Sequence, residues 1–184
     1  MRHLSFCCFI FAITLTSCSA PQSKYEQLGL EEITITKLLE GYDSGAFSAV
    51  DVVTAYLDRI EAIDKNGPAI NSIIAVNPNA LDIALELDQL LADGAKKGPL
   101  HGVPVILKDN IDTYGDMPNT AGARVMAGSM PDQDAFIAAK LKEAGAIIIA
   151  KANLSEWANF HSSYSSSGWS GLGGQTKNPF DITR

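Results

Sequence analysis

The amino-acid sequence predicts an α/β protein in which helices flank a mixed, largely parallel sheet. Segments with helical periodicity alternate along the chain with short, continuous apolar runs, such as Val103–Leu107 and Ala146–Ala150. Continuous apolar runs are typical of strands that are covered on both faces, and their alternation with helices favours parallel pairing. With 184 residues, 46% of them hydrophobic, the chain is long enough for one domain with a sizeable core.

The first half of the chain is predicted to contain three helices and one strand. Ser48 is a suitable N-cap for the longest helix, because apolar residues recur at helical spacing after it and Asp51 lies in the first turn. Asn66-Gly67-Pro68 would end that helix. The predicted elements are a short helix at Thr34–Gly41, a helix from Ser48 to Ile63, a strand at Ile70–Val76 and a helix at Ala80–Ala92.

The second half is predicted to alternate between strands and helices around one long loop. A loop of the length of Asp109–Met130 inside a compact domain is usually functional or mobile. Asn153, with Glu156 three residues later, has the spacing of a capping box and predicts a short helix. The predicted elements are a strand at Val103–Leu107, the loop at Asp109–Met130, a helix at Gln133–Ala144, a strand at Ala146–Ala150 and a short helix after Asn153.

A lysine directly follows each apolar strand: Lys108 follows the first and Lys151 the second. If the strand carries Lys108 into a low-dielectric interior, its pKa falls, and a neutral amine on a rigid strand end is a general base or a nucleophile. The alternative is a buried stem with the ammonium group in water. Because ligands of such sheets bind beyond the carboxyl ends of strands, Lys151 is a second candidate base, although a structural role suits it better. Asp109 is expected to support the loop or the lysine by hydrogen bonding.

The composition changes at Ser162–Thr176, which is rich in serine and glycine. One interpretation is a flexible linker. The other is an ordered loop, because Trp169 and Leu172 are large apolar residues that a linker does not need, and glycines let backbone N–H groups approach a ligand. The glycines are not followed by the Lys-Ser/Thr of a phosphate-binding P-loop.

The N-terminus predicts export. A short positive start is followed by an apolar stretch at Leu4–Thr16, which has the length of a signal-peptide core and is too short to span a bilayer. Leu15-Thr16-Ser17-Cys18 resembles the bacterial lipobox, so we expect a signal peptide at residues 1–17, lipidation of Cys18 and a polar tether at residues 18–30. The expected location is extracytoplasmic, in the periplasm or cell envelope of a bacterium. The alternatives are an ordinary secretory signal or a buried strand.

Charge and cysteine content exclude several other classes of function. The net charge of −7, with no basic stripe, argues against nucleic-acid binding. If Cys18 becomes the new N-terminus, Cys7 and Cys8 leave with the signal peptide, and neither a disulfide nor a cysteine metal site is possible. His101 and His161 lack metal-ligand spacing, so structural roles are expected for both. The sequence therefore predicts no metal and no cofactor.

Four stretches, in their order and spacing, carry a family resemblance. They are Gly102–Asn110, Thr120-Ala121-Gly122, Ile149–Trp157 and Gly173–Pro179. Together they resemble the N-terminal part of the amidase signature family over about residues 30–184, and their residues are most similar to those of bacterial peptide amidases. The resemblance implies the N-terminal portion of the amidase signature fold, at residues 31–184.

The resemblance also implies a Ser–cis-Ser–Lys triad in which Lys108 accepts the proton of the nucleophilic serine through the bridging serine. The two serine motifs of the family do not occur in this sequence, and Ser165, Ser166 and Ser167 precede the position where they are expected. The domain is therefore expected to be incomplete and this chain inactive by itself. The complete protein is expected to hydrolyse a small-molecule or peptide carboxamide to an acid and ammonia.

Three alternatives stay open at this stage. The chain could be a non-catalytic remnant with an exposed sheet edge. It could be a lipoprotein binding module that uses the Ser/Gly/Trp loop. It could also be a Schiff-base enzyme with Lys108 or Lys151 as the amine nucleophile, which borohydride would trap.

Overall fold

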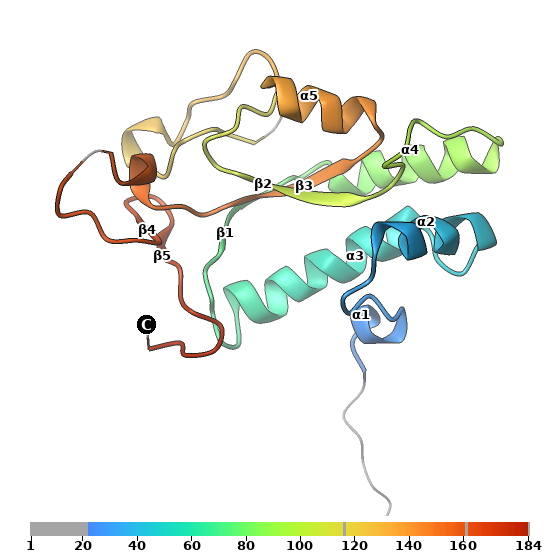
Figure 1. Ribbon diagram of the computed structural model, residues 1–184, viewed down its shortest axis with the longest axis horizontal. Helices are drawn as coiled ribbons and strands as arrows, with labels where there is room; N and C mark the ends of the chain where they lie inside the picture. Colours follow the sequence, from blue (N-terminus) through green and yellow to red (C-terminus); the bar gives the residue numbers. More distant parts are fainter. Residues whose placement is uncertain (1–21, 116, 161, 184) are drawn as a thin grey trace, which may run out of the picture.

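The computed structural model describes residues 22–115, 117–160 and 162–183, and it confirms the α/β class. Its centre is a mixed sheet of β1 (Ile73–Val76), β2 (Pro104–Lys108) and β3 (Ile147–Ala152), in the order β1-β3-β2. β2 pairs with β3 in parallel, whereas β1 pairs with β3 antiparallel. Helices cover both faces of this sheet (Figure 1).

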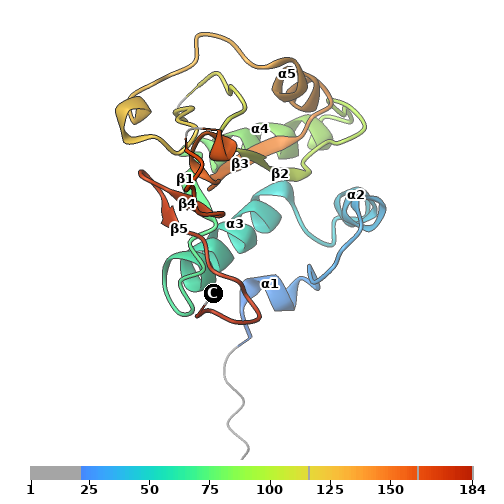
Figure 2. The same cartoon turned by 60° about the vertical axis from the view of Figure 1, so that its left-hand side comes forward.

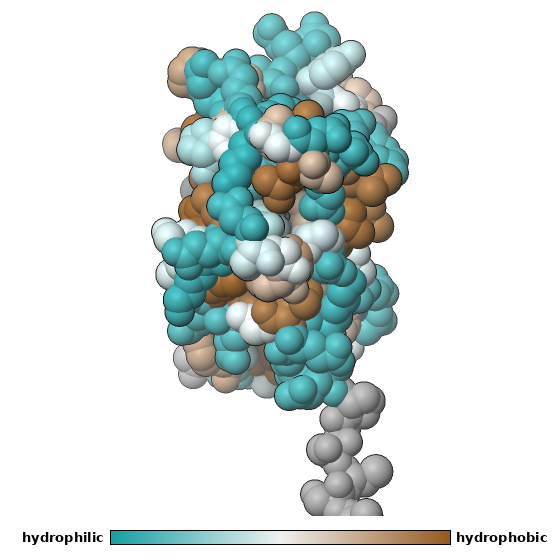
Figure 3. All heavy atoms as spheres, turned by 90° about the vertical axis from the view of Figure 1, so that its right-hand side faces the viewer, coloured by the Kyte–Doolittle hydropathy of each residue, from teal (hydrophilic) through white to brown (hydrophobic). Residues whose placement is uncertain are grey.

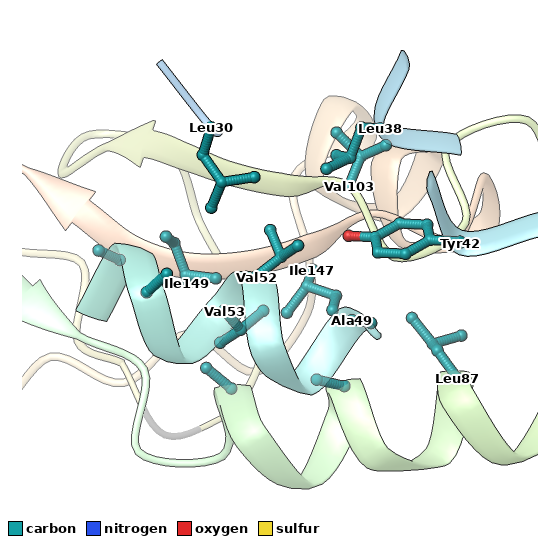
Figure 4. Packing of buried hydrophobic residues seen from close by; sticks show 14 of the residues in the cluster. Leu30, Leu38, Tyr42, Ala49, Val52, Val53, Leu87, Val103, Ile147 and Ile149 are labelled. Atoms are coloured by element: carbon teal, nitrogen blue, oxygen red, sulfur yellow. The ribbon is translucent and has the colours of Figure 1, made fainter. Parts of the chain in front are cut away.

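The two faces of β3 are buried against different helices. Ile147 and Ile149 join the main core, which is formed with α2 (Ile35–Ser44), α3 (Ala49–Arg59) and α4 (Ala80–Ala92). Figure 4 shows these side chains beside those of α3 and α4. Ile148 packs on the other face, in a smaller cluster with Ala138 and Leu141 of α5 (Phe136–Glu143). Since side chains alternate across a strand, burial on both faces explains why this strand is apolar throughout.

The helix boundaries follow local capping. Ser48 forms a capping box with Asp51 at the start of α3, as its sequence suggests. α3 continues directly into a π-helix, η1 (Ile60–Lys65). The predicted end of the first helix at Gly41 is wrong, because α2 runs on to Ser44 and ends at Gly45, whose φ is 71°. Gly41 instead provides space: a Cβ there would lie 2.1 Å from the Phe47 ring.

The described part of the expected tether is folded onto the domain. α1 (Lys24–Gln27) begins with a capping box between Ser23 and Glu26, and the Tyr25 ring packs edge-on against Tyr56 of α3. Leu30 is 0% exposed and belongs to the main core. The tether boundary at residue 30 is therefore too late, because apolar burial begins several residues earlier.

The serine- and glycine-rich segment is ordered, which contradicts the linker interpretation. It forms a small antiparallel hairpin of β4 (Trp169–Ser170) and β5 (Gly174–Gln175). The hairpin lies at the β1 end of the sheet in both ribbon views (Figures 1 and 2). Two backbone hydrogen bonds fix it there, from the Leu172 N–H to the Gly122 carbonyl and from the Lys177 N–H to the Ile70 carbonyl, each at 2.8 Å.

Several apolar side chains remain on the surface. Leu85 of α4 and Phe136 and Ile137 of α5 are exposed. On the side that lies at the right of Figure 1, apolar residues form separate patches between hydrophilic ones (Figure 3). Within the described ranges, no helix is both long and apolar enough to cross a membrane.

Candidate functional site

The two strand-end lysines lie at the same edge of the sheet, as predicted, but on opposite faces. In the parallel pairing of β2 with β3, Leu107 is the partner of Lys151 and Lys108 is the partner of Ala152. The two lysines are therefore one residue out of register, and successive residues of a strand point to opposite faces. The sheet thus separates their side chains into two different environments.

Lys108 faces a pocket of about 390 Å³. Its ammonium group donates a hydrogen bond of 2.8 Å to the main-chain carbonyl of Asn153, and its side chain is exposed. Of the two alternatives for Lys108, the low-dielectric interior is not found among the described residues, because β2 is an edge strand of this sheet. The residues that line the pocket are Lys108, Asn110, Asn153, Leu154, Ser155, Ala158, Gly168 and Thr176.

Lys151 is the buried lysine. It lies on the central strand, is 0% exposed, and donates hydrogen bonds to the Ile111 carbonyl at 2.6 Å and to Thr113 Oγ1 at 3.4 Å. Burial lowers the pKa of the Lys151 ammonium, and the negative charges of Asp109 and Asp112 partly oppose this effect. These contacts hold the loop that follows β2, which agrees with the structural role expected for Lys151.

Asp109 is the first residue of the same loop and binds its middle section. Its side chain is 1% exposed and accepts hydrogen bonds from the Thr120 hydroxyl and, at 3.4 Å, from the Gly122 N–H. Its main-chain carbonyl accepts from the Ala121 N–H at 2.8 Å. Oδ1 is buried and has no hydrogen-bond partner within the described residues. The loop, which includes the short 3-10 helix η2 (Arg124–Met126), is therefore closed onto the end of β2.

The predicted N-cap at Asn153 is wrong. The following 3-10 segment, η3 (Glu156–Asn159), begins after Ser155, and Trp157 and Ala158 have left-handed φ values of 50° and 53°. The Asn153 side chain instead holds together several segments of the chain. Its oxygen accepts from the Leu154 N–H and the Ser170 hydroxyl, and its nitrogen donates to Asn71, Gly174 and Thr176.

This role of Asn153 is not predicted from the sequence, although one signal points to it. Gly173 and Gly174 are adjacent glycines, and a Cβ at Gly173 would lie 2.4 Å from Asn153 Oδ1. A pair of glycines beside apolar Trp169 and Leu172 indicates close approach of the backbone to another group. The partner of that approach lies 20 residues earlier and cannot be found from local pattern.

The remaining candidates have structural contacts. His101 is 2% exposed; Nδ1 accepts from the Lys97 N–H at 3.0 Å and Nε2 lies 3.1 Å from the Leu87 carbonyl. Burial lowers the pKa of His101, although its contact with the Leu87 carbonyl opposes this. The Ser165 hydroxyl donates to Ser162 within its own loop. Cys18 and His161 lie outside the described residues.

Comparison with known proteins identifies the family. The family profile described as Amidase matches residues 51–184. The chain belongs to the amidase family. The crystal structure of native peptide amidase from Stenotrophomonas maltophilia superposes with a TM-score of 0.82 and 42% identity, and the match covers 85% of this chain and 32% of that one. An amidase family protein from Bacillus anthracis gives a TM-score of 0.79 and 38% identity, over 91% of this chain and 33% of that one.

The chain is also similar to a curated protein with a different name. One of the proteins that make up the glutamyl-tRNA(Gln) amidotransferase of Acidothermus cellulolyticus is 40% identical over 138 residues, which are 74% of this chain and 26% of that protein. The chain spans between a quarter and a third of the length of these amidase and amidotransferase relatives.

Proposed function

We propose that this chain supplies the lysine base of an amidase that hydrolyses a carboxamide to an acid and ammonia. The observation that carries the proposal is the position of Lys108, at the carboxyl end of a parallel strand, where it lines a pocket and is held by one main-chain hydrogen bond. Membership of the amidase family supports the reaction class. The likeness to a peptide amidase supports a peptide C-terminal amide as the substrate.

The proposed chemistry requires two serines in addition to Lys108. The neutral amine accepts a proton from the nucleophilic serine through a bridging serine, and the serine oxygen bonds to the carbonyl carbon of the substrate. The tetrahedral intermediate collapses, the C–N bond breaks, and the proton passes to the leaving nitrogen, which departs as ammonia. Water then hydrolyses the acyl-enzyme and regenerates the serine. The serine motifs of the family do not occur in this sequence, so we expect no hydrolysis by these 184 residues alone.

The assay uses a chimera in which this chain continues after Arg184 with the matching remainder of the Stenotrophomonas maltophilia peptide amidase. Ammonia release from a peptide amide is measured for the chimera and for its Lys108→Ala and Lys108→Arg variants. We expect both variants to lose hydrolysis, since alanine has no amine and arginine stays protonated. Lys140→Ala, at an exposed lysine of α5, is the matched control and should keep full activity. Turnover near that of the parent by Lys108→Ala would exclude Lys108 as the base.

The Schiff-base alternative is tested in the same preparation. A carbonyl substrate with borohydride would leave a covalent adduct on the lysine of a Schiff-base enzyme, whereas an amidase forms none. Lys151 is a poor candidate for such a nucleophile because its ammonium is enclosed and hydrogen-bonded to the loop.

For localisation, we propose anchoring through a lipid on Cys18, which rests on the order of apolar stretch, small residues and cysteine in the sequence. Labelling of a bacterial expression host with a radioactive fatty acid tests it. The label should enter the wild-type protein and be absent from Cys18→Ser. Equal labelling of both proteins would contradict the proposal.

A further inference from the structure

The pocket beside Lys108 is built from parts of the chain that are far apart in sequence. Lys108 and Asn110 come from the end of β2, whereas Gly168 and Thr176 come from the serine- and glycine-rich segment. A reaction that transfers a proton to Lys108 requires these two walls to keep a fixed separation. Asn153 is the residue that contacts both walls.

The main chain of Asn153 is fixed on the β2 side of the pocket. Its carbonyl accepts the 2.8 Å hydrogen bond from Lys108 Nζ. Its N–H donates to the Ser72 carbonyl at 2.7 Å, just before β1. The peptide unit that carries this carbonyl also carries the Leu154 N–H, which donates to Asn153 Oδ1 at 2.9 Å, so the carbonyl cannot turn away without breaking this second bond.

The side chain of Asn153 is fixed on the hairpin side. It is buried, with the residue 3% exposed, and Oδ1 accepts from the Ser170 hydroxyl at 2.8 Å. Nδ2 donates to the Gly174 carbonyl and to Thr176 Oγ1, both at 3.1 Å. A primary amide offers two donors and two acceptor sites, and this one uses both its donor and its acceptor capacity within the protein.

We propose that Asn153 is a positioning residue for Lys108, acting through both its carbonyl and its carboxamide. The carbonyl holds one N–H of the Lys108 amine, so the lone pair of the neutral amine points away from it. The carboxamide holds the opposite wall of the pocket through Ser170, Gly174 and Thr176. This inference rests on the proposed function for its catalytic meaning, while the geometry it predicts can be tested without turnover.

The first test observes the lysine side chains of the 184-residue chain by ¹H–¹⁵N NMR with ¹⁵N-labelled lysine, at mildly acidic pH and low temperature. Ammonium groups held by a hydrogen bond exchange slowly and give a cross-peak. We expect a Lys108 cross-peak in the wild type, assigned by its loss in Lys108→Arg, and its disappearance in Asn153→Ala. Tyr42→Phe, which removes a buried hydrogen bond elsewhere in the core, is the control and should keep the peak.

Two results would overturn the proposal: no Lys108 cross-peak in the wild type, or an unchanged peak in folded Asn153→Ala. If Asn153→Ala does not fold, Thr176→Val decides, because it removes one carboxamide partner with little change of shape. Weakening of the Lys108 peak in that variant supports the proposal, and an unchanged peak overturns it.

The second test measures kinetics in the amidase chimera. Thr176→Val should lower kcat by roughly 10-fold to 100-fold with KM nearly unchanged, because misplacement of a catalytic group acts on the chemical step. An effect on stability alone, equal to that of Tyr42→Phe and with kcat unchanged, overturns the proposal. If Lys108→Ala retains turnover, the proposed function fails, and the NMR result still decides the geometry.

Discussion

Replacement of Lys151 by methionine tests whether an ammonium group is truly enclosed on the central strand. The substitution removes the hydrogen bonds to the Ile111 carbonyl and to Thr113 and fills a similar volume. An acceptor left unsatisfied costs about 1–3 kcal/mol. At neutral pH the variant also no longer buries a charged group, which favours its folded state and opposes this loss. The net change in the free energy of unfolding is therefore expected to be small.

The difference between wild type and Lys151→Met should grow as the pH rises. Burial lowers the folded-state pKa of Lys151 below its ordinary value of 10.5, which the unfolded chain retains. Between the two values the unfolded state binds more protons, so the stability of the wild type rises with pH in this window. For each pKa unit by which burial lowers the pKa of Lys151, the free energy of unfolding of the wild type has risen by about 1.4 kcal/mol at pH 10.5. Methionine cannot titrate, so the variant lacks this gain.

Urea denaturation followed by circular dichroism, from neutral pH to about 10.5, measures the difference. Lys140→Met, at an exposed lysine, is the matched control for replacing a lysine by methionine on the surface. A difference for Lys151→Met that stays constant or shrinks with rising pH would refute the argument that Lys151 is desolvated.

Three further predictions use the same denaturation assay. Leu30→Ala should lower the free energy of unfolding by about 2–5 kcal/mol, because Leu30 is 0% exposed in the core. A change within about 0.5 kcal/mol, as expected for an exposed tether residue, would contradict this. Gly173→Ala should cost about 1–3 kcal/mol, since its Cβ would lie 2.4 Å from Asn153 Oδ1, whereas Gly128→Ala, with open space around it, should be nearly neutral. Tyr42→Phe should cost about 0.5–1.5 kcal/mol at neutral pH through loss of the hydrogen bond to Gly102. Burial and the charge of Asp88 raise the pKa of Tyr42 above its ordinary 10.0, so the wild type loses stability above pH 10 and the cost of the variant must shrink there; a growing cost would contradict it.

Local patterns predicted the elements of this fold better than their ends. The helix at Ala80–Ala92 was confirmed residue for residue, because its apolar periodicity and its flanking turn residues agree. Gly41 was mistaken for a helix end, since a glycine that provides space for Phe47 looks the same in sequence as one that adopts a positive φ. Asn153 was mistaken for a helix cap for a similar reason. Its side chain can bond a nearby N–H or distant groups, and only the tertiary structure decides between them.

The site shows where sequence reasoning about burial stops. Lys108 and Lys151 each follow an apolar strand, and the sequence offers no local difference that would make one exposed and the other enclosed. The difference arises from strand order: β3 lies between β1 and β2, so Lys151 is covered, whereas β2 is an edge of the described sheet and Lys108 is exposed. Strand order depends on pairing between distant segments. If Lys108 is the base, the low dielectric that holds it neutral must come from groups packed over its pocket, and not from its own strand.

Solvent exclusion at Lys108 should therefore be greater in the amidase chimera than in the 184-residue chain. Amine-reactive labelling of Lys108 should therefore be slower in the chimera, with Lys140 equally reactive in both proteins. Equal labelling of Lys108 in the two proteins would contradict the idea that this lysine becomes covered.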